Sequence, residues 1–389
     1  MKIYMFILIT FFSLIGCGNH NKVTLSDADN QGDVIKEGST LRISLDGQEN
    51  LPLNDIFQEY HFIPLETGDS ILMKGISGWR KILRRDNSLY IADFNRISVF
   101  DTLGCFENFI DHKGEGPGSY RALVAFTLDS NGDVFILDRI TMRIYVYSSR
   151  DEFRYAIKGI SDLNITDITM ANDSSLIVRS DMLRVSHMIH ILDKKTGQVR
   201  NSYLPVKDHS LTFWYPMPFS CYDGKLLLSM YQNNNVYELM ADSAIVRYTV
   251  NVADRLPPEG AQAFWERTDV TDMQLEFEAR EKGYITHIPF FIETDSTILL
   301  RFMCNTNPES PFNRYAVINK QDGKITVIRD FLFDDLCWKP ETIFPLDDGW
   351  VAIPIPAHLL FEKAPTEFRK RFPNIQEEDN PILCVGRLK

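Results

Sequence analysis

Short apolar segments bounded by turn residues recur along most of the chain. Residues 87–88 introduce the apolar run Leu89–Ala92, and the turn sequence at 131–133 introduces Val134–Leu137. Each run is followed by an Asp, a few polar residues and a second alternating segment. This order is typical of two antiparallel strands joined by a tight turn. The pattern therefore predicts pairs of strands.

Four further copies keep the same order in a weaker form, which gives six units. The equivalent apolar positions in the six units are Ile91, Ile136, Ile177, Leu227, Leu299 and Val351. Successive positions are separated by 45, 41, 50, 72 and 52 residues. Units of about 40 to 50 residues that hold four short strands are typical of a β-propeller. We therefore predict an all-β fold over residues 55–389, a six-bladed β-propeller. Its ring is expected to close by pairing Tyr60–Leu65 with the last strand, Pro381–Leu388, because an unclosed ring would open at one seam.

The longest step contains an insertion with helical signals. Pro257-Pro258 marks the start of one helical stretch, which runs through Trp265. Residues 271–274 have the pattern of a capping box for a second helix, and Gly283 ends that helix. We expect this short helical insertion to lie between blades 4 and 5, on a face of the disc. A further short helix is predicted over residues 364–372.

The N-terminus carries the features of an export signal. A lysine precedes an uncharged, mostly apolar run over residues 3–16, which is shorter than the roughly 20 residues that span a bilayer. The run closes with Leu14-Ile15-Gly16-Cys17, which resembles the lipobox of bacterial lipoproteins, whose cysteine receives a diacylglycerol. We expect residues 1–16 to be a lipoprotein signal peptide and Cys17 to be the lipidation site. Residues 17–54 are polar and weakly periodic, and we expect a flexible tether there.

Charge and composition exclude several classes of function. The chain has 41 Lys and Arg against 53 Asp and Glu, a net charge of −12, whereas proteins that bind nucleic acid present a basic surface. Shares of 44% hydrophobic and 24% charged residues are ordinary for a packed soluble protein and exclude a polytopic membrane protein. We therefore expect no nucleic-acid partner, and we expect the lipid anchor to be the contact with the membrane.

The remaining cysteines show no metal-binding spacing. They are an odd number without a Cys-x-x-Cys pair, namely Cys105, Cys221, Cys304, Cys337 and Cys384. This pattern favours cysteines that act as small hydrophobic residues. We therefore expect no required disulfide, no metal site and no cofactor.

Four stretches give the chain a family resemblance. They are Gly114-Glu115-Gly116-Pro117-Gly118-Ser119-Tyr120, Phe62-Ile63-Pro64-Leu65-Glu66-Thr67, the segment from Tyr90 to Gly104, and Glu377-Glu378-Asp379-Asn380-Pro381. In these stretches the chain resembles a family of bacterial six-bladed β-propeller lipoproteins related to NHL-repeat propellers, whose first blade ends in a Gly-x-Gly-Pro-Gly-Glu-Tyr turn. Ser119 stands where that family has Glu, which puts any role of a carboxylate at that point in doubt. The resemblance implies the fold and a place in the cell envelope, but no particular activity.

The residues after the lipobox bear on the side of the membrane. Residues 18–21 lack the acidic run that some Gram-negative lineages use to send lipoproteins to the cell surface. We therefore expect an anchor in the outer membrane that faces the periplasm.

Candidate ligand contacts come from the stretches that precede the repeats. We expect these stretches to form the innermost strands and to approach the central channel. Their aromatic and donor side chains are Trp79, Arg80, Arg121, Trp214, Tyr215, His287 and Trp338. Aromatic faces with fixed donors on a concave surface would suit a sugar or a peptide.

Two classes of function remain open at this point. The first is a non-catalytic binding or scaffold protein for a glycan, a peptide or an envelope protein. The alternative is a lyase or hydrolase on a propeller face that acts on a saccharide or peptide, with His287 as the residue to examine. No compact catalytic motif is present, although carboxylates from different blades could form a pair without a linear trace. Ionisable groups with shifted pKa values at the channel mouth would favour catalysis, whereas an aromatic and neutral mouth would favour binding.

Overall fold

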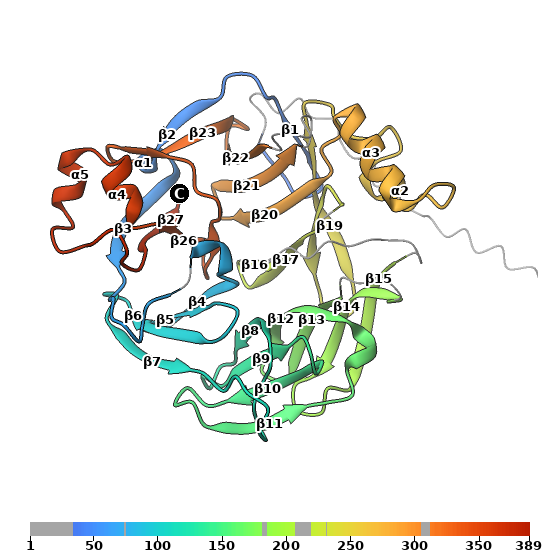
Figure 1. Ribbon diagram of the computed structural model, residues 1–389. Coiled ribbons are helices and arrows are strands. Elements are labelled where there is room, and N and C mark those ends of the chain that lie inside the picture. The colour runs from blue at the N-terminus through green and yellow to red at the C-terminus, as the bar shows by residue number, and fades with distance from the viewer. Residues whose placement is uncertain (1–33, 74, 181–184, 207–218, 231, 305–311) are drawn as a thin grey trace, which may run out of the picture.

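The computed structural model describes residues 34–73, 75–180, 185–206, 219–230, 232–304 and 312–389. Six β-sheets surround a central axis (Figure 1), and each contains a meander of four antiparallel strands. This arrangement confirms the predicted six-bladed β-propeller. All six equivalent positions of the sequence repeat lie in the second strand of a blade, so the repeat gave the number of blades correctly.

Blades 1 to 3 consist of four strands each. Blade 1 contains β4 (Lys81–Arg85), β5 (Ser88–Ala92), β6 (Ile97–Asp101) and β7 (Phe106–Ile110). Blade 2 contains β8 (Leu123–Leu128), β9 (Val134–Asp138), β10 (Arg143–Tyr147) and β11 (Phe153–Ile157). Blade 3 contains β12 (Ile165–Asn172), β13 (Ser175–Ser180), β14 (His187–Asp193) and β15 (Val199–Pro205).

The Asp that ends the repeated apolar run organises the loops of a blade. In blade 2 the carboxylate of Asp138 accepts hydrogen bonds from the backbone N–H groups of Ala122 (3.0 Å) and Ile140 (3.1 Å) and from the hydroxyl of Thr141 (2.7 Å). Its side chain is fully buried, so these bonds satisfy a charge that would otherwise be costly. The repeated Asp is therefore explained by loop structure.

Blades 4 and 5 carry additional strands. Blade 4 contains β16 (Phe219–Tyr222), β17 (Lys225–Ser229), β18 (Asn235–Leu239) and β19 (Ala244–Val252), and β1 (Thr40–Ile43) pairs in parallel with β19. Blade 5 contains β20 (His287–Glu293), β21 (Thr297–Cys304), β22 (Phe312–Asn319) and β23 (Ile325–Phe333). Two further strands pair with β23, β2 (Glu49–Pro52) in parallel and β24 (Leu336–Trp338) in antiparallel orientation.

The tether expected over residues 17–54 is wrong for residues 34–54, which pack against blades 4 and 5. The side chains of Leu41 and Ile43 are buried between these blades, and the carboxylate of Glu37 lies 2.7 Å from the guanidinium of Arg247. Because polar residues alternate with these few apolar ones, the segment has the composition of a tether but the periodicity of an edge strand. Residues 1–33, which include the expected signal peptide and Cys17, lie outside the described residues.

Blade 6 closes the ring with strands from both ends of the chain. It contains β25 (Phe344–Pro345), β26 (Trp350–Ile355), β27 (Ile382–Leu388) and β3 (Phe57–Pro64), which follows the short helix α1 (Leu53–Ile56). Ile382 lies opposite Pro64, and Leu388 lies opposite Phe57. The predicted closure between the first and last strands is therefore confirmed. Gly386 is required there, because a Cβ at this position would lie 2.9 Å from the ring of Phe57.

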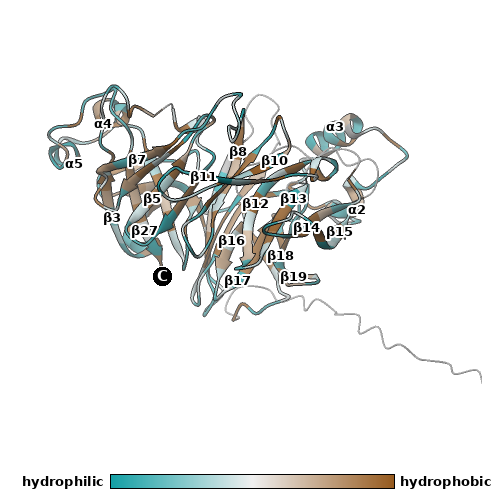
Figure 2. Cartoon of the chain, turned by 90° about the horizontal axis from the view of Figure 1, so that it is seen from below, coloured by the Kyte–Doolittle hydropathy of each residue, from teal (hydrophilic) through white to brown (hydrophobic). Residues whose placement is uncertain are grey.

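The larger helices gather on one face of the disc. The helices α2 (Ala261–Trp265) and α3 (Asp272–Lys282) lie between β19 and β20, as predicted for the insertion between blades 4 and 5. The helices α4 (His358–Glu362) and α5 (Thr366–Lys370) lie between β26 and β27. In an antiparallel meander, the link to the next blade and the turn between the second and third strands emerge on the same face. Both helix pairs therefore lie on one face of the disc, and Figure 2 shows α3, α4 and α5 on one side. We call this side the helical face.

The N-terminal segment enters from the opposite face. The backbone N–H of Ile35 donates to the carbonyl of Lys320 (2.9 Å), in the turn between β22 and β23. That turn joins the third and fourth strands of a blade and therefore lies on the face away from the helices.

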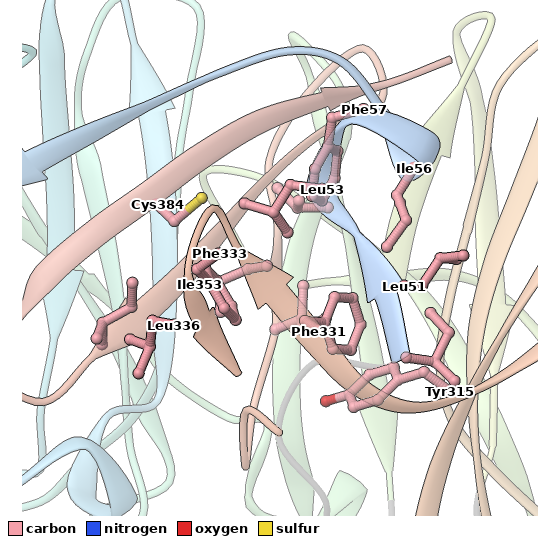
Figure 3. Close-up of a cluster of buried hydrophobic side chains, with 14 of the residues drawn as sticks. Leu51, Leu53, Ile56, Phe57, Tyr315, Phe331, Phe333, Leu336, Ile353 and Cys384 are labelled. Atoms are coloured by element: carbon pink, nitrogen blue, oxygen red, sulfur yellow. The ribbon is translucent and has the colours of Figure 1, made fainter. Parts of the chain in front are cut away.

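The apolar core is divided among the spaces between neighbouring blades. Within the described residues, one cluster of buried side chains fills each of the six blade interfaces. Figure 3 shows part of the cluster between blades 5 and 6, where the N-terminal segment contributes Leu51, Leu53, Ile56 and Phe57 beside Phe331, Phe333 and Ile353. The blades thus pack against one another mainly through apolar side chains, while the backbone ladders lie within each blade. Polar side chains add bonds between blades, such as the one from Arg247 of blade 4 to Glu293 of blade 5 (2.7 Å).

Candidate functional site

A cleft of about 560 Å³ opens on the helical face, where blades 5, 6 and 1 meet. Its walls come from the 3-10 turn η1 (Ile76–Gly78), the link between β24 and β25, the helix α4 and the loop that leads into β27. The charged and aromatic residues that line it are Trp338, Glu341, His358, Glu362, Lys363, Glu377, Glu378 and Asp379. We call it the acidic cleft.

The helix α4 forms one wall because prolines end the preceding strand. Pro356 stops β26 after Ile355, since it cannot donate to a strand ladder, and its carbonyl accepts the N–H of Leu359 (3.1 Å) in the first turn. Leu359 is buried in the core between blades 5 and 6, which orients the helix. The exposed residues His358 and Glu362 line the cleft.

The helix α5 is fixed to blade 6 by aromatic packing. The rings of Phe368 and Phe372 meet the ring of Phe62 edge-on, with centroids 5.3 and 6.0 Å away. The guanidinium of Arg371 lies 4.7 Å above the same ring and forms an ion pair with Asp334. Phe62 belongs to β3, so the long excursion between β26 and β27 is held on the strand that closes the ring.

Asn380 holds the acidic loop in place. Its side-chain Nδ2 donates to the carbonyls of Glu66 (2.7 Å) and Ile71 (2.9 Å), and its Oδ1 accepts the N–H of Met73 (2.7 Å). The backbone N–H of Asn380 donates to the hydroxyl of Thr67 (2.9 Å). Asn380 is 1% exposed, and two buried backbone groups and one partly buried group depend on its side chain.

The cleft has a strong excess of negative charge. Its lining contains five carboxylate side chains and one lysine, which gives a net charge of −4 with His358 neutral. Asp379 accepts the N–H of Gln376 (2.7 Å) within its own loop, and this bond fixes the loop without neutralising the charge. A concave site with one sign of charge raises the local concentration of ions of the opposite sign. Trp338 and the buried Leu359 add apolar surface, so the cleft suits a cationic ligand with apolar parts.

Trp79, Arg80 and Arg121, three of the residues predicted to contact a ligand, lie away from this cleft. Trp79 is 3% exposed and packs against Phe344 in the interface of blades 6 and 1. The guanidinium of Arg80 lies 3.4 Å above the ring of Phe94, and burial lowers its pKa to about 10. Arg121 is exposed and lies 3.6 Å from the carboxylate of Glu115.

His287 lies in the first position of β20, where it supports neighbouring loops. Its Nδ1 accepts the backbone N–H of Gln232 (2.9 Å), and its ring stacks on Trp265 with centroids 5.9 Å apart. Burial lowers the pKa of this imidazole to about 3, so the ring is neutral at physiological pH. A base that is buried and already accepts a backbone N–H is poorly placed for proton transfer in this arrangement.

Trp338 lines the acidic cleft, but it lies in an outer strand. Trp338 was expected in an innermost strand, and this expectation is wrong, because β24 pairs with β23 at the outside of blade 5. The innermost strand of the next blade, blade 6, is β25. The ring of Trp338 packs against Phe333 (5.6 Å between centroids). Trp214 and Tyr215, also predicted to contact a ligand, lie outside the described residues. The predicted residues that the structure describes are therefore not brought together in one site.

Among the described residues, the innermost strands place ionisable groups beside a small cavity at the central channel. The ammonium group of Lys81 lies 3.6 Å from the carboxylate of Asp167 and donates to the carbonyl of Ile168 (3.0 Å). Burial, followed by the nearby charge of Asp348, raises the pKa of Asp347. The cavity beside Lys81 and Asp347 measures about 70 Å³, which is the volume of roughly two water molecules. A sugar ring or a peptide does not fit this cavity.

Sequence reasoning missed most of the cleft. Its acidic loop was part of the family resemblance, but no function was attached to its carboxylates. The signal that could have found it is three consecutive acidic residues before Asn380-Pro381. The helix α4 gave no comparable signal, because its five residues show no helical periodicity.

The fold and this cleft define a six-bladed β-propeller with a charged cavity on one face. The chain matches the family described as Domain of unknown function (DUF4934) over residues 40–387, and it belongs to this family. No curated protein matches the chain. In the part that the structure describes, no helix combines the length and the apolar character needed to cross a membrane.

Several solved structures have a similar fold. The Bacteroides fragilis protein BF0058, provisionally named as exported, is 17% identical with a TM-score of 0.73, covering 90% of this chain and 100% of its own. BamB from Moraxella catarrhalis is 9% identical with a TM-score of 0.43, covering 85% of this chain and 99% of its own. Virginiamycin B lyase from Staphylococcus aureus is 10% identical with a TM-score of 0.41, covering 84% and 99%. At these identities the similarity concerns the fold alone.

Proposed function

We propose that the protein is an exported, lipid-anchored propeller that binds a cationic peptide segment in the acidic cleft. The observation that carries this proposal is the cleft's net charge of −4 beside the apolar surface of Trp338 and Leu359. The sequence alone left a glycan, a peptide or a partner protein open. Charge complementarity favours a ligand with Lys or Arg side chains, whose aliphatic stems can pack on apolar walls.

The proposed location follows from the N-terminal sequence and agrees with the name of a structural neighbour. The lipobox-like sequence ending at Cys17 and the name of BF0058 are both consistent with a place outside the cytoplasm. We further propose an outer-membrane anchor facing the periplasm. The N-terminal segment reaches the propeller on the face opposite the helices, so the cleft would not be blocked by the anchor.

The test is a titration of the full-length chain in nanodiscs with acetylated tetralysine and acetylated tetraglutamate peptides. We expect the basic peptide to bind and its affinity to fall steeply with salt, because screening weakens exposed ionic contacts. The double variant Glu377→Gln/Glu378→Gln should bind it about tenfold more weakly, a loss of about 1.4 kcal/mol.

The control must carry the same change in net charge. The double variant Glu259→Gln/Glu281→Gln changes two exposed carboxylates of the insertion around α2 and α3, on the other side of the helical face. It should bind tetralysine like the wild type. An equal loss in both double variants would mean that the peptide responds to overall charge, and the proposed site would be wrong.

A further inference from the structure

A second pocket on the helical face has different chemistry. It measures about 260 Å³ and lies between the end of β15, the turn between β17 and β18, and the helix α2. Its walls are mainly apolar and are formed by Met188, Leu204, Pro205, Val206, Met230, Tyr237, Val246 and Trp265, with Gln232, Asn233, Asn235, Gln262 and Glu266 as the polar residues. We call it the Gln232 pocket.

Three of the four carboxamides in this pocket are engaged in bonds within the protein. The side-chain Nδ2 atoms of Asn233 and Asn235 both donate to the hydroxyl of Tyr237, at 3.1 and 3.4 Å. The Oδ1 of Asn235 accepts the hydroxyl of Thr249 (2.9 Å), and the Nε2 of Gln262 donates to Glu266 (3.0 Å). These contacts shape the wall and engage Asn233 and Asn235 within the protein, whereas the exposed Gln262 uses only one of its donors.

Gln232 is the exception. Its backbone N–H is bound by His287, but within the described residues its side-chain carboxamide has no hydrogen-bond partner. The residue is only 7% exposed and lines the pocket. A carboxamide offers one acceptor and two donors. The polar atoms of Gln232 are not among the fully buried unsatisfied atoms of the described residues, so they reach the pocket and are available to a ligand.

The backbone of the pocket wall is held in an uncommon conformation. Gln232 has a φ of 57°, and Leu204 on the facing wall has a φ of 56°. Side chains of this size rarely adopt the left-handed region, and such residues tend to occur at ligand sites. Here the contact of Gln232 with His287 holds one of them in place, which gives the buried imidazole a positioning role.

The geometry points to a peptide ligand: we propose that the Gln232 pocket binds an apolar side chain of a peptide, while the adjacent peptide amide bonds to the Gln232 carboxamide. The pocket has the volume for one aliphatic side chain and one amide. Its two aromatic residues, Trp265 and Tyr237, are each 5% exposed, so neither offers a free ring face on which a sugar could stack. The aliphatic and methionine walls instead match a side chain such as leucine.

The test uses the full-length chain in nanodiscs and N-acetyl-leucine N-methylamide as the probe, with empty nanodiscs as background. Binding is followed by ligand-observed NMR titration. N-acetylglycine N-methylamide lacks the apolar side chain, and N-acetylglucosamine carries the same acetamido group on a sugar. We expect the leucine probe to bind at least about tenfold more tightly than either comparator.

Two variants separate the pocket from the overall fold. Gln232→Met keeps the size of the side chain but removes the carboxamide, and it should weaken the leucine probe about tenfold. Gln198→Met, at an exposed position in the turn between β14 and β15, is the matched control and should leave binding unchanged. Val246→Trp fills the pocket mouth without changing Gln232 and should abolish binding.

Several results would overturn the proposal. They are failure of the leucine probe to bind, tighter binding of N-acetylglucosamine, and wild-type affinity in Val246→Trp or in folded Gln232→Met. Tetralysine binding in the acidic cleft should be the same in all these variants, so this proposal can fail without affecting the proposed function.

Discussion

Replacement of Asn380 by alanine should destabilise the propeller and weaken the acidic cleft at the same time. The variant removes three side-chain hydrogen bonds and leaves the N–H of Met73 and the carbonyls of Glu66 and Ile71 without their partner. An unsatisfied buried backbone group costs roughly 1 to 3 kcal/mol, and the low end of this range gives a loss of about 3 to 5 kcal/mol for the three groups, one of which is only partly buried. That is a large part of the roughly 5 to 15 kcal/mol by which folded proteins are stable.

The expected change in melting temperature follows from the size of the chain. Unfolding entropy of about 2.1 cal/mol/K per residue gives roughly 0.8 kcal/mol/K for 389 residues. The loss then lowers Tm by about 4 to 6 °C in a thermal scan followed by intrinsic fluorescence. The affinity for tetralysine should fall as well, because Asn380 fixes the loop that carries Glu377 and Glu378.

Asn374→Ala is the matched control, since Asn374 is exposed in the same excursion between β26 and β27. It should leave Tm and binding unchanged. Asn380→Asp keeps the acceptor but loses the two donated bonds, so it should also lower Tm. If Asn380→Ala melts within about 1 °C of the wild type, the loop is not held by this side chain and the reasoning is refuted.

Two further predictions concern the ends of the chain. Deletion of residues 382–389 removes β27, in which Ile382, Leu383 and Val385 are at most 2% exposed. The deletion should cost free energy of unfolding on the order of the whole stability margin. An unchanged Tm would mean that the ring does not depend on its closing strand. Burial would raise the pKa of Glu37, but the charges and hydrogen bonds of Arg247 and Lys225 outweigh it and lower the pKa. A lowered folded pKa stabilises the N-terminal segment above the ordinary value of 4.5, and this contribution is lost as the pH falls through the folded pKa. The protection of residues 35–43 against hydrogen exchange, corrected for the intrinsic exchange rate at each pH, should therefore fall at acidic pH in the wild type. It should depend less on pH in Glu37→Gln, and identical protection profiles would contradict the ion pair.

The fold could be predicted because each blade repeats local signals. Turn residues, alternating strands and the buried Asp after the second strand occur within a few residues of one another, so they leave a regular trace in the sequence. The capping box at Thr271 is similarly local, and its two hydrogen bonds are present in α3. The first helix of the insertion was predicted to start at Pro257, but it starts at Ala261 because Gly260 adopts a φ of 85° after a turn.

The cleft could not be predicted because its residues meet only in three dimensions. Trp338 and Glu341 precede the last blade, Ile76 precedes the first, and Glu377 follows α5, so no linear spacing relates them. The N-terminal segment was misread for a related reason. Its polar residues suggested a tether, but its partners, Arg247 and the edges of blades 4 and 5, lie some two hundred or more residues away.

The most direct test of the account is a charge reversal within the acidic cleft. Each Glu→Lys change adds two charges, so Glu341→Lys, Glu377→Lys and Glu378→Lys together change the net charge of the cleft from −4 to +2. The triple variant should lose tetralysine binding and gain binding of tetraglutamate. The same number of reversals at the exposed residues Asp242, Glu259 and Glu281 should leave the preference for tetralysine intact. If both triple variants change preference equally, or if the cleft variant still prefers tetralysine, the acidic cleft is not the binding site.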